Sequence, residues 1–298
     1  MTLKAFAGSF FKTIPTMTIQ TICVCGAGTM GSGIAQAAAQ SGFHALLFDV
    51  NPAILQKAKT AIDKNLQSLV EKNKLSAPDK ENILNRIAFI SDINDCIADL
   101  IIEAIIENPD AKAGLFNQLA EVNHSDVIFA TNTSSLSVAA IAAKVNHPER
   151  VAGMHFFNPA TVMKLVEIVK APQTSEAVVQ TIYDLALQMG KTPVHCKDAP
   201  GFIVNHVARP YYLEALRLLE QGLCDVETID TVLESAGFKM GPFRLMDLIG
   251  NDVNYAVSCS VYEALGKPTR LQPSFIQEEK VKTGALGRKS GRGYYNYT

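Results

Sequence analysis

The sequence predicts an α/β protein: a Rossmann-type, doubly wound and mostly parallel sheet, followed by a second, all-helical domain at the C-terminus. Short apolar segments alternate with helical segments up to about residue 198. This alternation is typical of right-handed crossovers in a parallel sheet. A glycine-rich loop directly follows the first apolar segment. From Pro200 onward the periodicity is helical, with interruptions such as Gly222 and Gly237, which indicates a change of domain.

The expected strands are short apolar runs bounded by turn residues. They cover residues 18–25, 44–49, 87–90, 99–104, 127–130, 151–156, 162–169 and 192–195. The helices expected between them cover residues 32–41, 52–72, 78–85 and 110–122. We therefore expect a first domain over residues 17–198, with a helical insertion at about 52–85, and a helical domain over residues 199–298.

The composition is that of an ordinary globular protein, with 48% hydrophobic and 19% charged residues. The formal net charge of -2 gives no electrostatic reason to expect nucleic acid or an anionic membrane as partner. No apolar run approaches the roughly 20 residues that cross a bilayer. The six cysteines are scattered without the spacing of a zinc site, so we expect reduced, structural thiols and no metal.

Residues 1–16 carry Lys4 and Lys12 but no acidic residue. They resemble a weak targeting segment, yet they have no Arg and lack the apolar core of a signal peptide. We therefore expect an N-terminal tail, either disordered or preceding an alternative start at Met17, on a cytoplasmic protein.

The loop after the first predicted strand has the pattern G-x-G-x-x-G, formed by Gly26, Gly28 and Gly31 with Thr29 and Met30 between the last two. The pattern alone is weak, but its place between a strand and a helix is the context that gives it meaning. The first glycine permits a tight turn, the second lets the backbone approach a pyrophosphate, and the third allows close packing of helix and strand. The phosphates would face the helix N-terminus. The sequence therefore predicts a dinucleotide site.

Asp49 ends the second predicted strand, about 20 residues after the loop, where an acid accepts hydrogen bonds from the adenosine ribose. A carboxylate there would repel a 2′-phosphate, and no Arg follows to bind one. This favours NAD over NADP.

His155 is the only one of the six histidines at the end of an apolar strand, on the side where parallel sheets bind ligands. Histidine suits proton transfer near neutral pH. Glu167 lies in the next apolar run, and a buried carboxylate is costly unless it is paired. A turn at Asn158 and Pro159 would fold that run back and place Glu167 against His155. The alternative is a structural histidine and an edge-strand glutamate.

The chain resembles the 3-hydroxyacyl-CoA dehydrogenase family from Thr18 to Tyr297, and looks closest to its short bacterial 3-hydroxybutyryl-CoA members. The resemblance rests on several motifs in the same order: VCGAGTMGSGIAQ (24–36), IIENPDAKAGLF (105–116), ATNTSSL (130–136), HFFNPATVMKLVEIV (155–169), DAPGFIVN (198–205), GPFRLMDLIG (241–250) and GRKSGRGYYNY (287–297). It implies an NAD-dependent oxidoreductase that acts on C3 of a 3-hydroxyacyl-CoA, such as 3-hydroxybutyryl-CoA, in fatty-acid metabolism.

The resemblance also implies roles for individual residues. It makes His155 the catalytic acid/base and Glu167 its partner, with Ser134 and Asn205 binding the 3-oxygen of the substrate or orienting the histidine. Residues implied near the cofactor are Asn158, Glu107, Lys112 and Lys289. The alternatives are ordinary: a helix cap for the serine, a helix-terminal glutamate and solvated lysines.

The family places CoA against the helical insertion, where Lys57 and Lys64 are the candidate contacts. Ala58 and Asn65 depart from the Ser and Lys expected there, and a basic helix face is usually only solvated. The contacts of CoA and the preferred chain length therefore stay open at this stage.

The helical domain carries more apolar surface than a small domain buries alone, and the family uses it to dimerise, so we expect a homodimer. Two other functions stay open. One is a related, gulonate-type hydroxyacid dehydrogenase, and the other is a non-catalytic NAD-binding protein. The second is disfavoured because the expected catalytic residues are all present.

Overall fold

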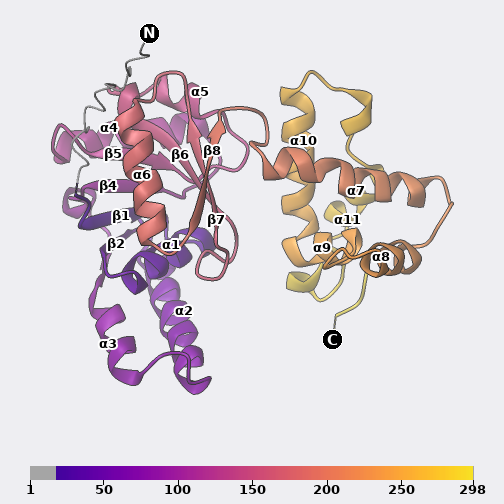
Figure 1. The fold of residues 1–298 in the computed structure, drawn as a ribbon, viewed down its shortest axis with the longest axis horizontal. Coiled ribbons are helices and arrows are strands. Elements are labelled where there is room, and N and C mark those ends of the chain that lie inside the picture. Colours follow the sequence, from indigo (N-terminus) through magenta and orange to yellow (C-terminus); the bar gives the residue numbers. More distant parts are fainter. Residues whose placement is uncertain (1–17, 298) are drawn as a thin grey trace, which may run out of the picture. The chain divides into compact units, whose positions relative to one another are not determined.

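The computed structural model describes residues 18–297 (Figure 1). The chain forms two compact units. The first contains the residues up to Asn132 together with Ile141–His195, and the second contains Thr133–Ala140 together with the residues from Cys196 onward. The N-terminal tail expected at residues 1–16 lies outside the described residues.

The first unit is built on an eight-stranded sheet of order β3-β2-β1-β4-β5-β6-β7-β8. The pairs from β3 to β6 are parallel, and β6 pairs antiparallel with β7. The strands are β1 (Thr21–Cys25), β2 (His44–Phe48), β3 (Ile87–Ile90), β4 (Leu100–Glu103), β5 (Ile128–Thr131), β6 (Val151–Phe156), β7 (Leu165–Lys170) and β8 (Thr192–Lys197). The predicted mostly parallel sheet is confirmed.

The helices of this part begin where the local sequence caps them. Asn51 and Asn108 accept backbone N–H groups at the starts of α2 and α4, and in both helices a proline follows in the first turn. The helices are α1 (Thr29–Gln40), α2 (Pro52–Glu71), α3 (Ala77–Asn85), α4 (Pro109–Val122), α5 (Val138–Ala142) and α6 (Glu176–Gln188). The α2–α3 pair, the expected insertion, extends away from the sheet (Figure 1).

Several sequence-based boundaries were wrong. The first strand begins at Thr21 instead of Thr18, and β7 begins at Leu165 because residues 162–164 belong to the turn before it. The helix α6 was not predicted, although Ser175 caps it and its apolar face, which includes Ile182, joins the same core as α1.

The second unit is helical, as expected. Its helices are α7 (Val204–Glu220), α8 (Val226–Ser235), α9 (Pro242–Ile249), α10 (Asn251–Ala264) and α11 (Phe275–Lys282). Leu216, Phe243 and Met246 are fully buried in its core. The buried carboxylate of Asp247 accepts the backbone N–H groups of residues 294 and 295, which holds the C-terminal segment against α9.

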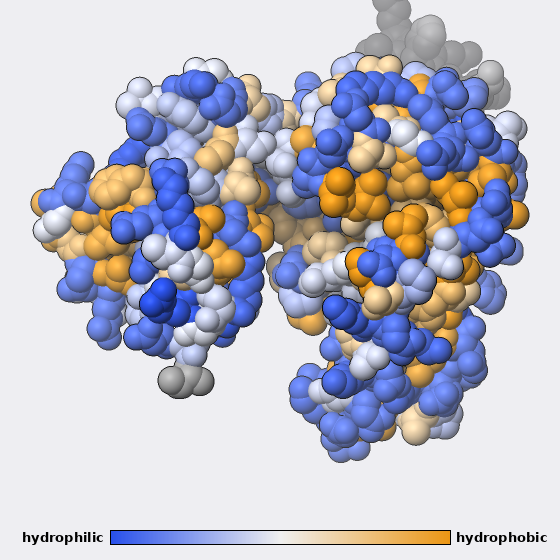
Figure 2. Space-filling view, turned by 180° about the vertical axis from the view of Figure 1, so that it is seen from behind, coloured by the Kyte–Doolittle hydropathy of each residue, from blue (hydrophilic) through white to orange (hydrophobic). Residues whose placement is uncertain are grey.

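Apolar side chains are also found on the surface of the helical unit (Figure 2). Val207, Phe238 and Phe275 are each at least half exposed. Within residues 18–297 we find no helix with both the length and the apolar character needed to cross a membrane. Within residues 18–297 the six cysteines are not joined in disulfides.

Candidate active site

The antiparallel pairing of β6 with β7 places His155 directly opposite Glu167. The distance between His155 Nδ1 and Glu167 Oε2 is 2.7 Å, and both residues are buried. The ring of Phe157 lies 4.6 Å from the imidazole, measured between centroids. A buried carboxylate bonded to one ring nitrogen fixes the orientation of the imidazole and leaves proton exchange to the other nitrogen. The predicted contact between the two side chains is therefore present.

The glycine loop has the shape that a dinucleotide needs. A Cβ on Gly31 would lie 1.7 Å from the carbonyl oxygen of Gly26, so helix and loop touch through backbone alone. Gly28 faces open space, with no atom within 4 Å of a built Cβ. No side chain caps α1 at Gly28, so the first N–H groups of this helix can meet an anion. The loop therefore fits the pyrophosphate of NAD.

Asp49 stands just after β2, beside this loop. Its Oδ2 accepts the N–H of Ala27 and its Oδ1 accepts the N–H of Asn51, both at 2.9 Å. These two bonds fix the plane of the carboxylate. Each oxygen keeps acceptor capacity for a ribose hydroxyl, because a carboxylate accepts about four hydrogen bonds.

A buried ion pair lies near the same ends of the strands. Lys112 Nζ is 2.6 Å from Glu103 at the end of β4 and 3.0 Å from Glu107, which is partly exposed. Lys112 is 1% exposed, so the alternative of a solvated lysine was wrong. Burial raises the pKa of Glu103 against the opposing effects of Lys112 and Thr131. Sequence reasoning missed Glu103, although an acid at the end of an apolar strand was the signal used for Asp49.

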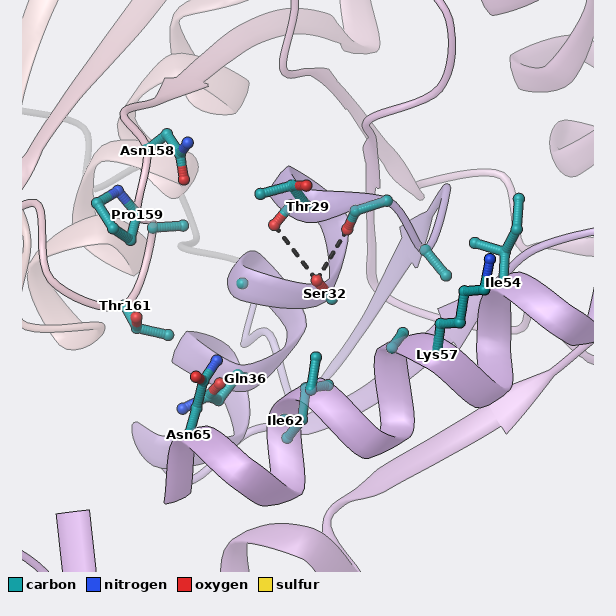
Figure 3. A pocket seen from close by; sticks show the side chains of 16 residues that line it. Thr29, Ser32, Gln36, Ile54, Lys57, Ile62, Asn65, Asn158, Pro159 and Thr161 are labelled. Carbon is teal, nitrogen blue, oxygen red and sulfur yellow. Dashed lines mark hydrogen bonds between the residues drawn. The ribbon is translucent and has the colours of Figure 1, made fainter. Parts of the chain in front are cut away.

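A pocket of about 360 Å³ opens beside the glycine loop (Figure 3). It is lined by the loop, by α1 and α2, and by residues 158–161. Lys57 lines it from α2, and Asn158 lines it from the β6–β7 turn. Thr29 also contributes, while Lys64 is exposed and is not among the lining residues. The structure thus brings Lys57, but not Lys64, to the same pocket as Gly28.

Three of the predicted site residues belong to the second unit. Asn205 lies in the first turn of α7, and its Nδ2 donates to the carbonyl oxygen of Ser134 at 3.3 Å. Lys289 forms an ion pair of 2.6 Å with Asp252. The segment Thr133–Ala140, which carries Ser134, groups with the helical unit although it follows a strand of the sheet, and no local pattern predicts this grouping.

A Rossmann sheet with a glycine-rich loop at a helix N-terminus, an acid after the second strand and a buried His–Glu pair has the features expected of an NAD-dependent dehydrogenase. The chain matches two family models: 3-hydroxyacyl-CoA dehydrogenase, NAD binding domain, over residues 21–199, and 3-hydroxyacyl-CoA dehydrogenase, C-terminal domain, over residues 201–297. The chain belongs to the 3-hydroxyacyl-CoA dehydrogenase family, and its first domain is an NAD-binding domain. The predicted family, cofactor and class of enzyme are confirmed.

Individual relatives agree with this assignment. The chain is 50% identical to the 3-hydroxyadipyl-CoA dehydrogenase of Escherichia coli K12 over 94% of its own length, and it spans 60% of the length of that protein. It is 40% identical to the human mitochondrial hydroxyacyl-coenzyme A dehydrogenase, covering 94% of this chain and 91% of the relative. The crystal structure of (S)-3-hydroxybutyryl-CoA dehydrogenase from Ralstonia eutropha matches with a TM-score of 0.89 at 38% identity, over 94% of this chain and 100% of that one.

Proposed function

We propose that this chain transfers a hydride between NAD and C3 of a 3-hydroxyacyl-CoA of the 3-hydroxybutyryl-CoA/acetoacetyl-CoA type. The observation that carries the proposal is the buried His155–Glu167 pair, with 2.7 Å between Nδ1 and Oε2, in a sheet that also carries the dinucleotide loop. A gulonate-type substrate is the alternative, and it differs from the proposed one in having no thioester.

In this proposal, different residues of the first unit bind the cofactor and transfer the proton. The backbone from Gly26 to Gly31, including Thr29 and Met30, would hold the pyrophosphate, and Asp49 would accept the ribose hydroxyls. Bound NAD supplies the hydride acceptor. Nε2 of His155 takes the proton of the substrate hydroxyl as the C3–H bond breaks. Glu167 stabilises the resulting imidazolium through Nδ1, and its burial protects that interaction from solvent.

The remaining residues have roles that follow from the family resemblance. We propose that Ser134 and Asn205 hydrogen-bond the 3-oxygen of the substrate, and that Asn158 lies near the nicotinamide. Glu107, Lys112 and Lys289 are proposed near the cofactor. For CoA, the pocket favours Lys57, whereas Lys64 lies outside it and has less support.

A homodimer formed through the helical domain is also proposed, on the strength of exposed apolar side chains such as Val207, Phe238 and Phe275. Analytical ultracentrifugation tests it. A sedimentation coefficient that corresponds to the monomer at micromolar concentration would refute the dimer.

We also propose a cytoplasmic location, and fractionation of cells that produce the protein tests it.

The relatives of this chain are named for substrates with different acyl chains. The E. coli relative is named for 3-hydroxyadipyl-CoA, and the R. eutropha structure for (S)-3-hydroxybutyryl-CoA. An acyl chain that ends in a carboxylate is a second candidate for this protein, because the helical unit holds a buried arginine, Arg209, that has no acidic partner among residues 18–297.

The test of the proposed function follows NADH absorbance with acetoacetyl-CoA as substrate. NADPH replaces NADH in one control, and free acetoacetate replaces the thioester in another. Fast turnover that requires both NADH and the CoA ester supports reaction, cofactor and substrate class together. Turnover of free hydroxyacids without the thioester, or no turnover with tight NADH binding, would refute the proposal.

A further inference from the structure

Arg209 lies in the middle of α7 and is 2% exposed. Its Nε donates to the carbonyl oxygen of Asn205 at 3.0 Å. Its Nη1 donates to the carbonyl oxygen of Asn254 at 3.0 Å and to Ser258 Oγ at 2.8 Å. The ring of Tyr212 lies 4.9 Å away. All of these acceptors are neutral, so the described part of the chain gives this guanidinium no carboxylate partner.

A buried cation without an anion is costly in free energy, and Arg209 also has N–H donors that its contacts do not use. A guanidinium has five N–H donors. The contacts of Arg209 within residues 18–297 use only Nε and Nη1, which leaves Nη2 without an acceptor there. Burial lowers the pKa of Arg209 to about 10, so the group keeps its charge at neutral pH. By contrast, buried Lys112 is neutralised by Glu103.

The neighbouring helix α10 adds a buried donor that has no acceptor within residues 18–297. Asn254 is 1% exposed, and its Oδ1 accepts Nε2 of Gln277 at 3.0 Å. This bond fixes the orientation of the amide, and Nδ2 of Asn254 then has no acceptor in the part of the chain that the structure describes. The oxygen of Gln277 also has no donor within residues 18–297, but it is an acceptor and does not itself contribute to binding a carboxylate. A buried arginine beside such a donor has the chemistry of a carboxylate-binding site.

Arg209 is placed one helical turn from Asn205. Residues four apart lie on the same helix face with a rise of about 6 Å, and a helical side chain leans toward the N-terminus. The bond from Arg209 Nε to the Asn205 carbonyl shows that the guanidinium does lean this way. In an acyl chain with six carbons, three bonds of about 1.5 Å each separate C3 from a terminal carboxyl carbon. Three such bonds span about 4 Å in an extended chain, and a hydrogen bond of about 3 Å from the carboxylate covers the rest of one helical turn.

We propose that Arg209 is a specificity residue that binds the terminal carboxylate of a dicarboxylic 3-hydroxyacyl thioester, with the carboxylate about three carbons beyond C3. This inference rests on the proposed function, in which Asn205 contacts the 3-oxygen. The carboxylate supplies the anion that the chain does not, and Nη2 donates to it.

The test compares two substrates of equal length, 3-hydroxyadipyl-CoA and 3-hydroxyhexanoyl-CoA, which differ in the terminal carboxylate. The readout is the ratio of their kcat/KM values, in which general effects on folding cancel. We expect the unaltered protein to prefer the dicarboxylic substrate by about 10- to 100-fold, the size of a charge-assisted hydrogen bond. Arg209→Met should abolish most of this preference, mainly by lowering kcat/KM for the dicarboxylic substrate.

Arg217→Met is the matched control. It removes the same charge from the same helix, but Arg217 is partly exposed and already pairs with Glu214, so the substrate ratio should not change. If Arg209→Met does not fold, the monomethyl ester of 3-hydroxyadipyl-CoA replaces the variant. It should lose the preference with the unaltered protein.

Three results would overturn the inference: no preference in the unaltered protein, equal losses on both substrates in Arg209→Met, or full activity on the ester. Each of these leaves the proposed function standing if acetoacetyl-CoA is still reduced. Failure of all thioesters, including acetoacetyl-CoA, would instead refute the proposed function and this inference with it.

Discussion

Replacing Lys112 with Met should cost the first unit a large part of its stability. The side chain of Glu103 is 0% exposed and that of Lys112 is 1% exposed, with 2.6 Å between Nζ and Oε1. Glu103 also accepts the Thr131 hydroxyl and the Ile105 N–H, both at 2.7 Å, so it cannot move out to solvent without losing them. Removing one partner of a buried pair leaves an uncompensated charge, which costs about 3–5 kcal/mol.

An exposed ion pair provides the comparison. Lys144 pairs with Asp110 at 2.5 Å, but these side chains are 49% and 77% exposed. Lys144→Met should therefore cost only about 0.2–1 kcal/mol. Urea unfolding followed by circular dichroism measures both losses. Adding Glu103→Gln to the Lys112→Met variant should recover part of the loss, because the buried charge is then gone.

The loss of stability in Lys112→Met should depend on pH. Burial raises the pKa of Glu103 in the folded state above its unfolded value, so the folded state binds this proton more tightly. Stability contributed by Glu103 therefore falls as pH rises through the folded pKa. Lys112 lowers that pKa, and its loss should raise it further. The deficit of Lys112→Met should be smallest near about pH 5 and larger near about pH 8. A deficit that matches Lys144→Met, or one that is independent of pH, would refute this reasoning.

The remaining predictions concern activity and cofactor binding. His155→Ala and Glu167→Gln should each lower kcat by at least ~10²-fold with NAD affinity nearly unchanged. The exposed His147 serves as control, and His147→Ala should leave kcat unaltered; near-normal turnover in either buried variant would contradict the catalytic roles. Asp49→Ala should raise the KM for NAD about tenfold through lost ribose contacts, with little change in kcat; an unchanged KM excludes the contact. Gly28→Ala should fold normally, since its Cβ meets nothing within 4 Å, yet weaken NAD binding in a fluorescence titration. Unchanged NAD affinity in Gly28→Ala would mean that the pyrophosphate does not bind at this loop.

The parts of the fold that follow from local patterns could be predicted from the sequence. Strands β3 and β6 have the predicted bounds, because each is a short, mainly apolar run followed within two residues by a turn residue. Helix α2 begins at the predicted Pro52, since Asn51 caps it. Helix α6 was not predicted, although its cap at Ser175 and its apolar face are local signals.

The parts that depend on tertiary contacts could not be predicted. Lysines 57 and 64 lie two helical turns apart in one sequence segment, and only the fold separates a pocket-lining side chain from a solvated one. The burial of Lys112 depends on Glu103, which lies on another element. Arg209 could not be singled out from the sequence, because its lack of an acidic neighbour within residues 18–297 is a property of the folded chain.

The contact between His155 and Glu167 shows how the apolar core determines the geometry of the candidate site. In the same antiparallel register, Met154 faces Ile168, and both are fully buried in the main core on the opposite side of the sheet. A slip of one residue would turn Glu167 to the core side and Ile168 toward the histidine. Burying a carboxylate among apolar side chains without a partner costs several kcal/mol. The slipped register would bury Glu167 in this way, so it is much less stable than the observed one. The orientation of the imidazole is therefore set by the packing behind it, and substitutions in that core should disturb the pair even though they never touch it.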